Sequence, residues 1–471
     1  MSLPISSPGK KTAPNVEKNM EKIQGIVICL LAVGFVMLQV FPQTVVEVSV
    51  SLLILAVIVG ITPMIRGSTL TICLVLLFLA VGLMLYHNAS PQEWLQAMRV
   101  NITLVALFLF APLLGIPVRT GGYVEALKIV LSRKMNDPHF FFLGSKLLTH
   151  VLGVVINIGS VSIVYQLMKA STIKTPRLMA NAINRGFISS IFWSPYFSAM
   201  ALILSQLPIA WTSIVIYMLG LALISLLVSF LIERPLIESM DHSNGRKTVD
   251  DYEDKELRKA KRKVVELFFL LFLIMAVVLL LEAVISSSIV LIICLVSVVF
   301  PVLWCFLTGK RALYREEIKE HIFVGIPRMK KEIVLFLIAG FFSGAFLHSE
   351  LSGQLVELIN GLFGNFTIGI AFFLSLLIVL SAVVGLHPIV VVTILVTSIK
   401  PELIGLSPEY FAVLLLASWG ISNTVSPATA VNNLLASLLK VDVFELSIRW
   451  NFKFVIIMLF LIPIYLEITG L

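Results

Sequence analysis

Apolar runs of about 17 to 25 residues recur along almost the whole chain, and they constrain its fold more than any other feature. A run of this length crosses the hydrocarbon core of a bilayer as one α-helix, whose backbone groups bond within the segment. The composition agrees, because 58% of the 471 residues are hydrophobic and 13% are charged, whereas soluble domains are about 45–50% apolar and about 25% charged. The sequence therefore predicts an all-α polytopic membrane protein.

Eleven runs are predicted to span the membrane, and two of these, near Pro176 and Ser407, are broken spans. The eleven runs begin near Gln24, Thr44, Ser68, Arg99, Pro176, Pro208, Val264, Ser286, Glu332, Ser407 and Phe452. Two other apolar regions, Phe140 to Lys169 and Asn365 to Lys400, hold polar or helix-breaking residues at their middle. We interpret these two regions as re-entrant hairpins, which enter and leave the membrane on the same side.

The distribution of positive charges supports the hairpins. If the N-terminus is cytoplasmic and both regions are re-entrant, only Arg99 and Lys400 of the 35 Lys and Arg residues face outside, while Arg185 and Lys146 are embedded. The others then lie on the cytoplasmic side, as the positive-inside rule requires. If the two regions crossed the membrane once, Lys440, Arg449 and Lys453 would lie outside. This count places the C-terminus outside and predicts a multi-pass protein of the cell membrane.

The chain divides into five parts. Residues 1–23 are expected to form a disordered cytoplasmic tail, and residues 24–42 an extra first span. Residues 44–232 form a first repeat of three spans, a hairpin, a broken span and a closing span. A charged cytoplasmic linker, 233–263, separates it from a second, inverted repeat at 264–471.

The two repeats also match in their polar segments. In the first half "GVVINIGSVSIV" (153–164) is followed by "GFISSIFWSPYFSAMALI" (186–203). In the second half "AVVGLHPIVVVTI" (382–394) is followed by "WGISNTVSPATAVNNLLA" (419–436). Each following segment contains a Ser-Pro pair just after a cluster of small hydroxyl side chains. Weak identity at similar spacing is what an old internal duplication leaves.

Helices interrupted at membrane depth free backbone groups that protein or a water-filled cavity must satisfy. Half-helix N-termini suit anions, and unwound carbonyls suit Na⁺. The candidate substrate-binding residues come from the two hairpin tips and the two broken spans: Asn157, Gly159, Ser160, Arg185, Ser189, Ser190, Ser194, Pro195, His387, Pro388, Ser422, Asn423, Thr424, Ser426, Pro427 and Thr429. A coupling Na⁺ is expected at Asn157, Ser160, Ser422 and Asn423, and no cofactor is expected.

Several of these residues have a second interpretation. Small hydroxyl side chains also serve close helix packing. His387 is either a titrating contact or a cap for freed backbone groups. Arg185 either draws a substrate carboxylate toward the site or is held by local carbonyls or by Asn181 or Asn184 on its own helix.

The acidic residues narrow the substrate class. No Asp lies at either break, and Glu282, Glu350 and Glu357 fall at edges or in loops. Because a cation/proton exchanger needs an intramembrane carboxylate, the breaks favour an anionic substrate accompanied by a coupling cation. Lys146 and His150 are expected to face an aqueous vestibule.

This order of spans, hairpins and broken helices resembles the ion transporter superfamily, and within it the divalent anion/sodium symporters. The likeness covers Thr44 to Glu467 and implies a homodimer in which the site-bearing part moves as an elevator. That family has a Ser-Asn-Thr triplet at each hairpin tip. Here "SNT" occurs once, at Ser422–Thr424 in a broken span, whereas the tips read "NIGS" and "GLHP".

We therefore expect a secondary active transporter of a small organic anion, similar to a di- or tricarboxylate, coupled to Na⁺ or H⁺. An exporter of a toxic anion or drug-like carboxylate remains an alternative. A membrane-embedded transferase is disfavoured, because His, Asp and Glu do not cluster at membrane depth. The expected partners are the substrate, the bilayer and a second copy of the chain, and no nucleic acid.

Overall fold

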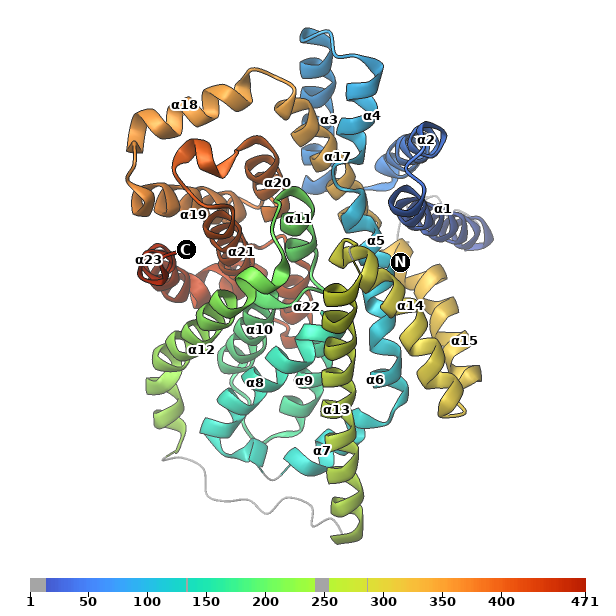
Figure 1. The fold of residues 1–471 in the computed structure, drawn as a ribbon. Coiled ribbons are helices and arrows are strands. Elements are labelled where there is room, and N and C mark those ends of the chain that lie inside the picture. The colour runs from blue at the N-terminus through green and yellow to red at the C-terminus, as the bar shows by residue number, and fades with distance from the viewer. Residues whose placement is uncertain (1–13, 133, 242–253, 286) are drawn as a thin grey trace, which may run out of the picture.

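The computed structural model describes residues 14–132, 134–241, 254–285 and 287–471, and within these ranges the regular structure is entirely helical (Figure 1). In chain order the α-helices are α1 (Pro14–Val40), α2 (Thr44–Ile61), α3 (Ser68–Tyr86), α4 (Pro91–Arg99), α5 (Ile102–Phe110), α6 (Ile116–Thr120), α7 (Tyr123–Leu131), α8 (Pro138–Ile156), α9 (Gly159–Ala170), α10 (Pro176–Trp193), α11 (Ser198–Gln206), α12 (Trp211–Asp241), α13 (Asp254–Val284), α14 (Ile289–Leu307), α15 (Arg311–Glu320), α16 (Ile326–Arg328), α17 (Lys330–Leu347), α18 (Leu351–Phe363), α19 (Thr367–Val383), α20 (Pro388–Ser398), α21 (Pro408–Val425), α22 (Ala430–Leu439) and α23 (Trp450–Thr469).

Eleven helical segments of the described chain are long and apolar enough to cross a membrane, so the chain is a multi-pass membrane protein. The number equals our expectation, but its members differ at two places. Helix α8, expected as one limb of a hairpin, has the length and composition of a span. Helix α17, expected as a simple span, meets α18 at a bend of 77°, which falls at the polar residues His348–Glu350.

Two predicted polar segments are shorter than expected. Residues 14–23 are helical and not part of a disordered tail, because Pro14 begins α1 at a position where its missing N–H costs nothing; residues 1–13 lie outside the described ranges. The linker 233–263 is largely helical as well, since α12 continues to Asp241 and α13 begins at Asp254. Its central part, 242–253, also lies outside the described ranges.

Two helix pairs occupy the predicted hairpins. Helices α8 and α9 pack on each other, and α19 packs on α20. The first pair reverses at Asn157 and Ile158, and the second between Val384 and His387. Asn157 has a φ of +55° and Gly385 a φ of +93°, so each reversal uses backbone outside the usual right-handed region. That the pairs are re-entrant in a membrane remains a prediction.

Both broken spans end their first helix at the predicted Ser-Pro pair. Helix α10 ends one residue before Ser194, and α21 ends one residue before Ser426. In Figure 1 α11 lies above α10, whereas α22 lies below α21. Inverted repeats require such opposite directions, although the inversion relative to a membrane stays a prediction.

The two broken spans form the centre of the molecule. In each, 83% of the most apolar window is buried within the protein, more than in any other candidate span of the described chain. Helix α10 packs against α8, α12 and α21, and α21 packs against α19 and α23. The breaks are therefore held inside protein, where their freed backbone groups can find partners.

Candidate functional site

A cavity of about 370 Å³ lies where the two hairpin tips and the two breaks meet. The first tip contributes Asn157 and Gly159, and the second contributes His387. The break after α10 contributes residues 196–199, and the break after α21 contributes Asn423 and residues 428–431. The cavity thus joins four segments that are far apart in the sequence.

Four helices begin at this cavity. Its walls include Gly159 at the start of α9, Ser198 at the start of α11, His387 at the cap of α20 and Thr429 at the cap of α22. The first N–H groups of a helix lack partners within that helix and carry a positive partial charge. In α9, α11 and α22 the cap side chain accepts no hydrogen bond from these groups. Four positive helix ends therefore meet at one space.

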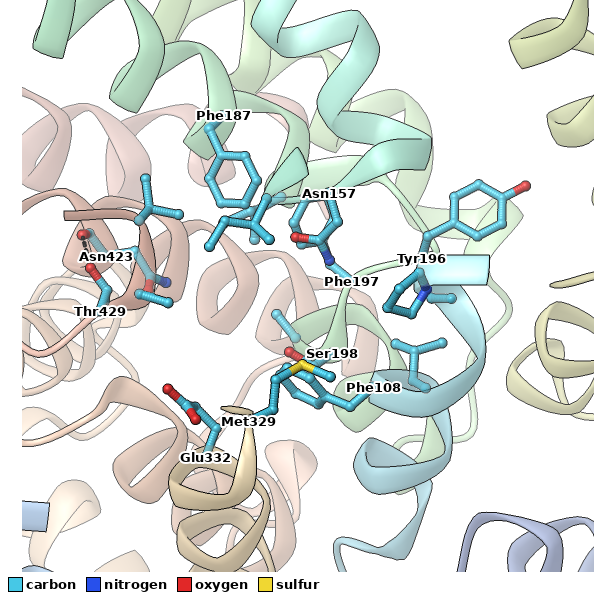
Figure 2. Close-up of a pocket in the computed structure, with 18 of the residues that line it drawn as sticks. Phe108, Asn157, Phe187, Tyr196, Phe197, Ser198, Met329, Glu332, Asn423 and Thr429 are labelled. Atoms are coloured by element: carbon cyan, nitrogen blue, oxygen red, sulfur yellow. Dashed lines mark hydrogen bonds between the residues drawn. The ribbon is translucent and has the colours of Figure 1, made fainter. Parts of the chain in front are cut away.

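Two amide side chains reach the same space from opposite halves of the chain. Figure 2 shows Asn157 and Asn423 on different sides of the opening, with Thr429 beside Asn423. The Asn423 side-chain nitrogen donates to the Trp419 carbonyl at 2.9 Å, which fixes the orientation of that amide. His387 caps α20, because its Nδ1 accepts from the Ile389 N–H at 3.2 Å.

Asn432, which is not among the residues predicted for the site, organises the second break. Its side-chain nitrogen lies 3.0 Å from the Asn423 carbonyl, 3.1 Å from that of Thr424 and 2.8 Å from that of Ser426. Its side-chain oxygen accepts from the Asn184 amide. This residue therefore satisfies freed carbonyls of the break and connects them to α10.

Most of the predicted hydroxyl side chains do not reach the cavity. The hydroxyls of Ser160, Ser189, Ser190, Ser422 and Thr424 bond to backbone carbonyls three residues away or nearer in the same segment. These residues are buried, as the helix-packing interpretation requires. The expected Na⁺ ligands are consequently divided, since Asn157 and Asn423 line the cavity but Ser160 and Ser422 do not.

The Ser-Pro pairs shape the breaks. Ser194 Oγ donates to the Val154 carbonyl at 2.8 Å, and so attaches the first break to α8. Ser426 Oγ accepts from the Ala428 N–H at 3.3 Å. Pro195 and Pro427 lie within the breaks, and Pro388 is the first residue of α20, the position that proline suits.

Arg185 does not line the cavity, contrary to our expectation. It is completely buried, and its guanidinium donates to Asn451 Oδ1 at 2.8 Å and to the Trp450 carbonyl at 2.9 Å. It also pairs with Glu233 at 3.1 Å. These partners occupy the guanidinium, so Arg185 connects α10 to α12 and α23.

Lys146 is also buried and not in the expected vestibule. Its Nζ donates to the carbonyls of Ser225 and Leu226 at 3.3 and 2.8 Å. His150, one turn further along α8, lies 2.8 Å from Ser189 Oγ and 3.3 Å from the Trp193 indole nitrogen. Both side chains therefore join α8 to its neighbours.

Two charged residues that were not predicted from the sequence also line the cavity. Arg119 is paired with Glu317 at 2.8 Å. Glu332 comes from the first turn of α17, and Figure 2 shows it beside Met329 at the edge of the open space. From the sequence, Glu332 is identified only as the start of a span. Nothing in the local sequence indicates that it lies opposite the breaks.

No family model and no curated protein matches this chain. One solved structure similar to it is that of the Alcanivorax borkumensis YdaH transporter, described as having an unusual topology. The identity is 15%, the alignment covers 95% of this chain and 98% of that one, and the TM-score is 0.43. A likeness this weak carries no argument about function.

Proposed function

We propose that this protein is a secondary active transporter whose substrate, a small organic anion, binds in the cavity between the two tips and the two breaks. The observation that supports it most is the meeting of four helix N-termini at one cavity. Helix N-termini stabilise anions without any basic side chain, and broken helices with this arrangement are typical of transporter sites.

The walls of the cavity suggest the form of the anion. Aromatic rings of Phe108, Phe187, Phe197, Phe336 and Trp419 line it together with aliphatic side chains. Apolar walls favour a ligand with an apolar body, while a few polar groups fix its orientation. The substrate proposed here is therefore a carboxylate attached to an apolar part, and export of a drug-like carboxylate remains the second candidate.

The proposed mechanism is alternating access. The tips and breaks move together as an elevator against the remaining helices, and Na⁺ or H⁺ accompanies the anion. The resemblance to divalent anion/sodium symporters suggests a homodimer. A measurement of the molecular mass of the purified protein in detergent tests this.

Transport by purified protein in liposomes tests the proposal. We expect uptake of one or more labelled organic anions that depends on an imposed Na⁺ or pH gradient. If no anion of the panel shows gradient-dependent flux and the protein instead turns over a lipid-linked substrate, the protein is a transferase and the transporter proposal is wrong.

A pair of asparagines provides a matched control for the site. Asn423→Ala removes an amide that lines the cavity, and Asn360→Ala removes one on α18 that does not. Each amide donates to one backbone carbonyl at 2.9 Å. Anion-induced thermal stabilisation, which reports binding to the folded state, should be lost in the first variant and kept in the second.

A further inference from the structure

Glu332 is the only carboxylate among the described residues that line the cavity. Its Oε2 is inaccessible to solvent and accepts no hydrogen bond from the described residues. Ionised carboxylates inside proteins normally have a cation or several donors beside them. Burial of this oxygen is therefore favourable only when a proton or another cation neutralises the carboxylate.

No basic side chain in the cavity supplies that cation. Arg119, the one Lys or Arg among the lining residues, is already paired with Glu317. His387 uses Nδ1 to cap α20 and places its ring against Phe336 at 5.4 Å between centroids. Lys331, adjacent in sequence, interacts with Glu332 through its charge, but its side chain is exposed to solvent and does not line the cavity.

The helices that pack against α17 do not supply it either. Helices α3, α5 and α20 contain no Asp, Glu, Lys or Arg. Arg99 of α4 is paired with Glu47 of α2 at 3.0 Å. Glu93 of α4 lies 3.7 Å from His348, which follows the far end of α17. The remaining charged groups on neighbouring elements are Arg328 of α16 and Glu357 of α18.

An ionised Glu332 opposes the function proposed above. The four helix N-termini attract an anion to the cavity, whereas a carboxylate in its wall repels the same anion. Like charges in a site shielded from water repel strongly, and one of two neighbouring carboxylates then takes up a proton or a cation. An anion therefore enters readily only after the charge of Glu332 has been neutralised.

We propose that Glu332 binds a monovalent cation, H⁺ or Na⁺, and that the cavity accepts its anion only when this cation is bound. The proposal rests on the anionic substrate proposed above and adds the residue that couples it to a cation. Glu332 makes no contact with the substrate and acts on it only through its charge.

The first arm of the test contains no substrate. Thermal unfolding of the purified protein is followed as Na⁺ replaces choline, at acidic and alkaline pH, for the wild type, Glu332→Gln and Glu282→Gln. Glu282 is a matched control, because its Oε2 is also buried without a partner but it does not line the cavity. If the cation is Na⁺, it should stabilise the wild type and Glu282→Gln at alkaline pH but not Glu332→Gln. If the cation is H⁺, acid should stabilise Glu332→Gln less than the wild type, and the acid response that remains there comes from the other buried carboxyl, Glu282.

The second arm measures the affinity for the anions that shift unfolding. If the cation is H⁺, wild-type affinity falls about tenfold per pH unit once Glu332 is ionised, because one proton is taken up with each anion. If the cation is Na⁺, affinity rises with Na⁺ at constant pH. In Glu332→Gln, whose amide imitates the neutral acid, the affinity should be high and independent of both.

The two arms separate the two proposals. Equal dependence on cations in Glu332→Gln and the wild type overturns the role of Glu332 and leaves the transporter untouched. Binding of organic cations that is lost in Glu332→Gln overturns both, since Glu332 would then contact the substrate. A substrate-free cation response that needs Glu332, with no anion bound by any variant, refutes the anionic substrate alone.

Discussion

Arg185 Nη1 lies 3.1 Å from Glu233 Oε1, and both side chains are completely inaccessible to solvent. The same carboxylate oxygen accepts from the Asn181 amide at 2.9 Å. Glu233 also lies 3.4 Å from Arg177, which is half exposed. Arg185→Met leaves Glu233 only this weaker charged partner, and Glu233→Gln leaves the buried guanidinium without a carboxylate; breaking a buried pair costs about 3–5 kcal/mol. We expect Arg185→Met and Glu233→Gln each to lower the free energy of unfolding by about this amount, measured by denaturation in detergent.

The double variant and a surface pair complete this experiment. Arg185→Met combined with Glu233→Gln should be more stable than the sum of the single effects predicts, because no buried charge is then left unpaired and Arg177, which loses Glu233, is half exposed. Arg234 and Glu238 form an exposed pair at 2.6 Å on the same helix as Glu233. Its removal should cost less than about 1 kcal/mol, and a cost as large as that of Arg185→Met would contradict the argument.

Asn432 and Asn433 are adjacent in sequence but differ in burial and in hydrogen-bond partners. Asn432 is buried and approaches three carbonyls of the break, whereas Asn433 is exposed and donates to Pro427 and Thr429. Asn432→Ala leaves freed carbonyls unsatisfied, at about 1–3 kcal/mol each, and should abolish anion-driven stabilisation. Asn433→Ala should retain it, because water can replace an exposed amide. Equal loss in both variants would show that the break does not depend on Asn432.

Two substitutions of Asn157 distinguish the strain of its backbone from the contribution of its side chain to binding. Its φ of +55° and ψ of −134° lie where residues other than glycine are strained, at a cost of order 1–3 kcal/mol. Asn157→Gly should therefore unfold at a higher temperature than Asn157→Ala, although both lack the amide that faces the cavity. Both should show weaker anion-induced stabilisation, and unaltered binding in both would remove Asn157 from the site.

Gly186 allows α10 to approach α8 closely. A Cβ at this position would lie 2.5 Å from the Lys146 carbonyl oxygen, which is backbone and cannot turn aside. Gly186→Ala should destabilise the protein, by about 1–3 kcal/mol as for other overpacked sites, and lower the transport rate. Gly82→Ala in α3 is the control, because nothing lies within 4 Å of its added Cβ. Its unfolding temperature should equal or exceed that of the wild type.

The breaks could be predicted from the sequence, but the charged contacts could not. Proline removes a backbone donor and ends a helix, so the Ser-Pro pairs located the ends of α10 and α21 to within one residue. Glu233 was assigned to a solvated linker because hydropathy falls there, yet α12 continues for eight residues beyond it. Its pairing with Arg185 joins residues 48 positions apart, a distance at which no local pattern is informative.

The helix ends at the cavity have a consequence for how such proteins diverge. Attraction provided by backbone N–H groups survives almost any exchange of side chains, provided that the helices still begin at the same places. Relatives can then keep the same preference for anions while their wall residues change beyond recognition. Selection would act on the positions of prolines and glycines more than on the chemistry of neighbouring side chains, so a search that compares residue identities has little to detect.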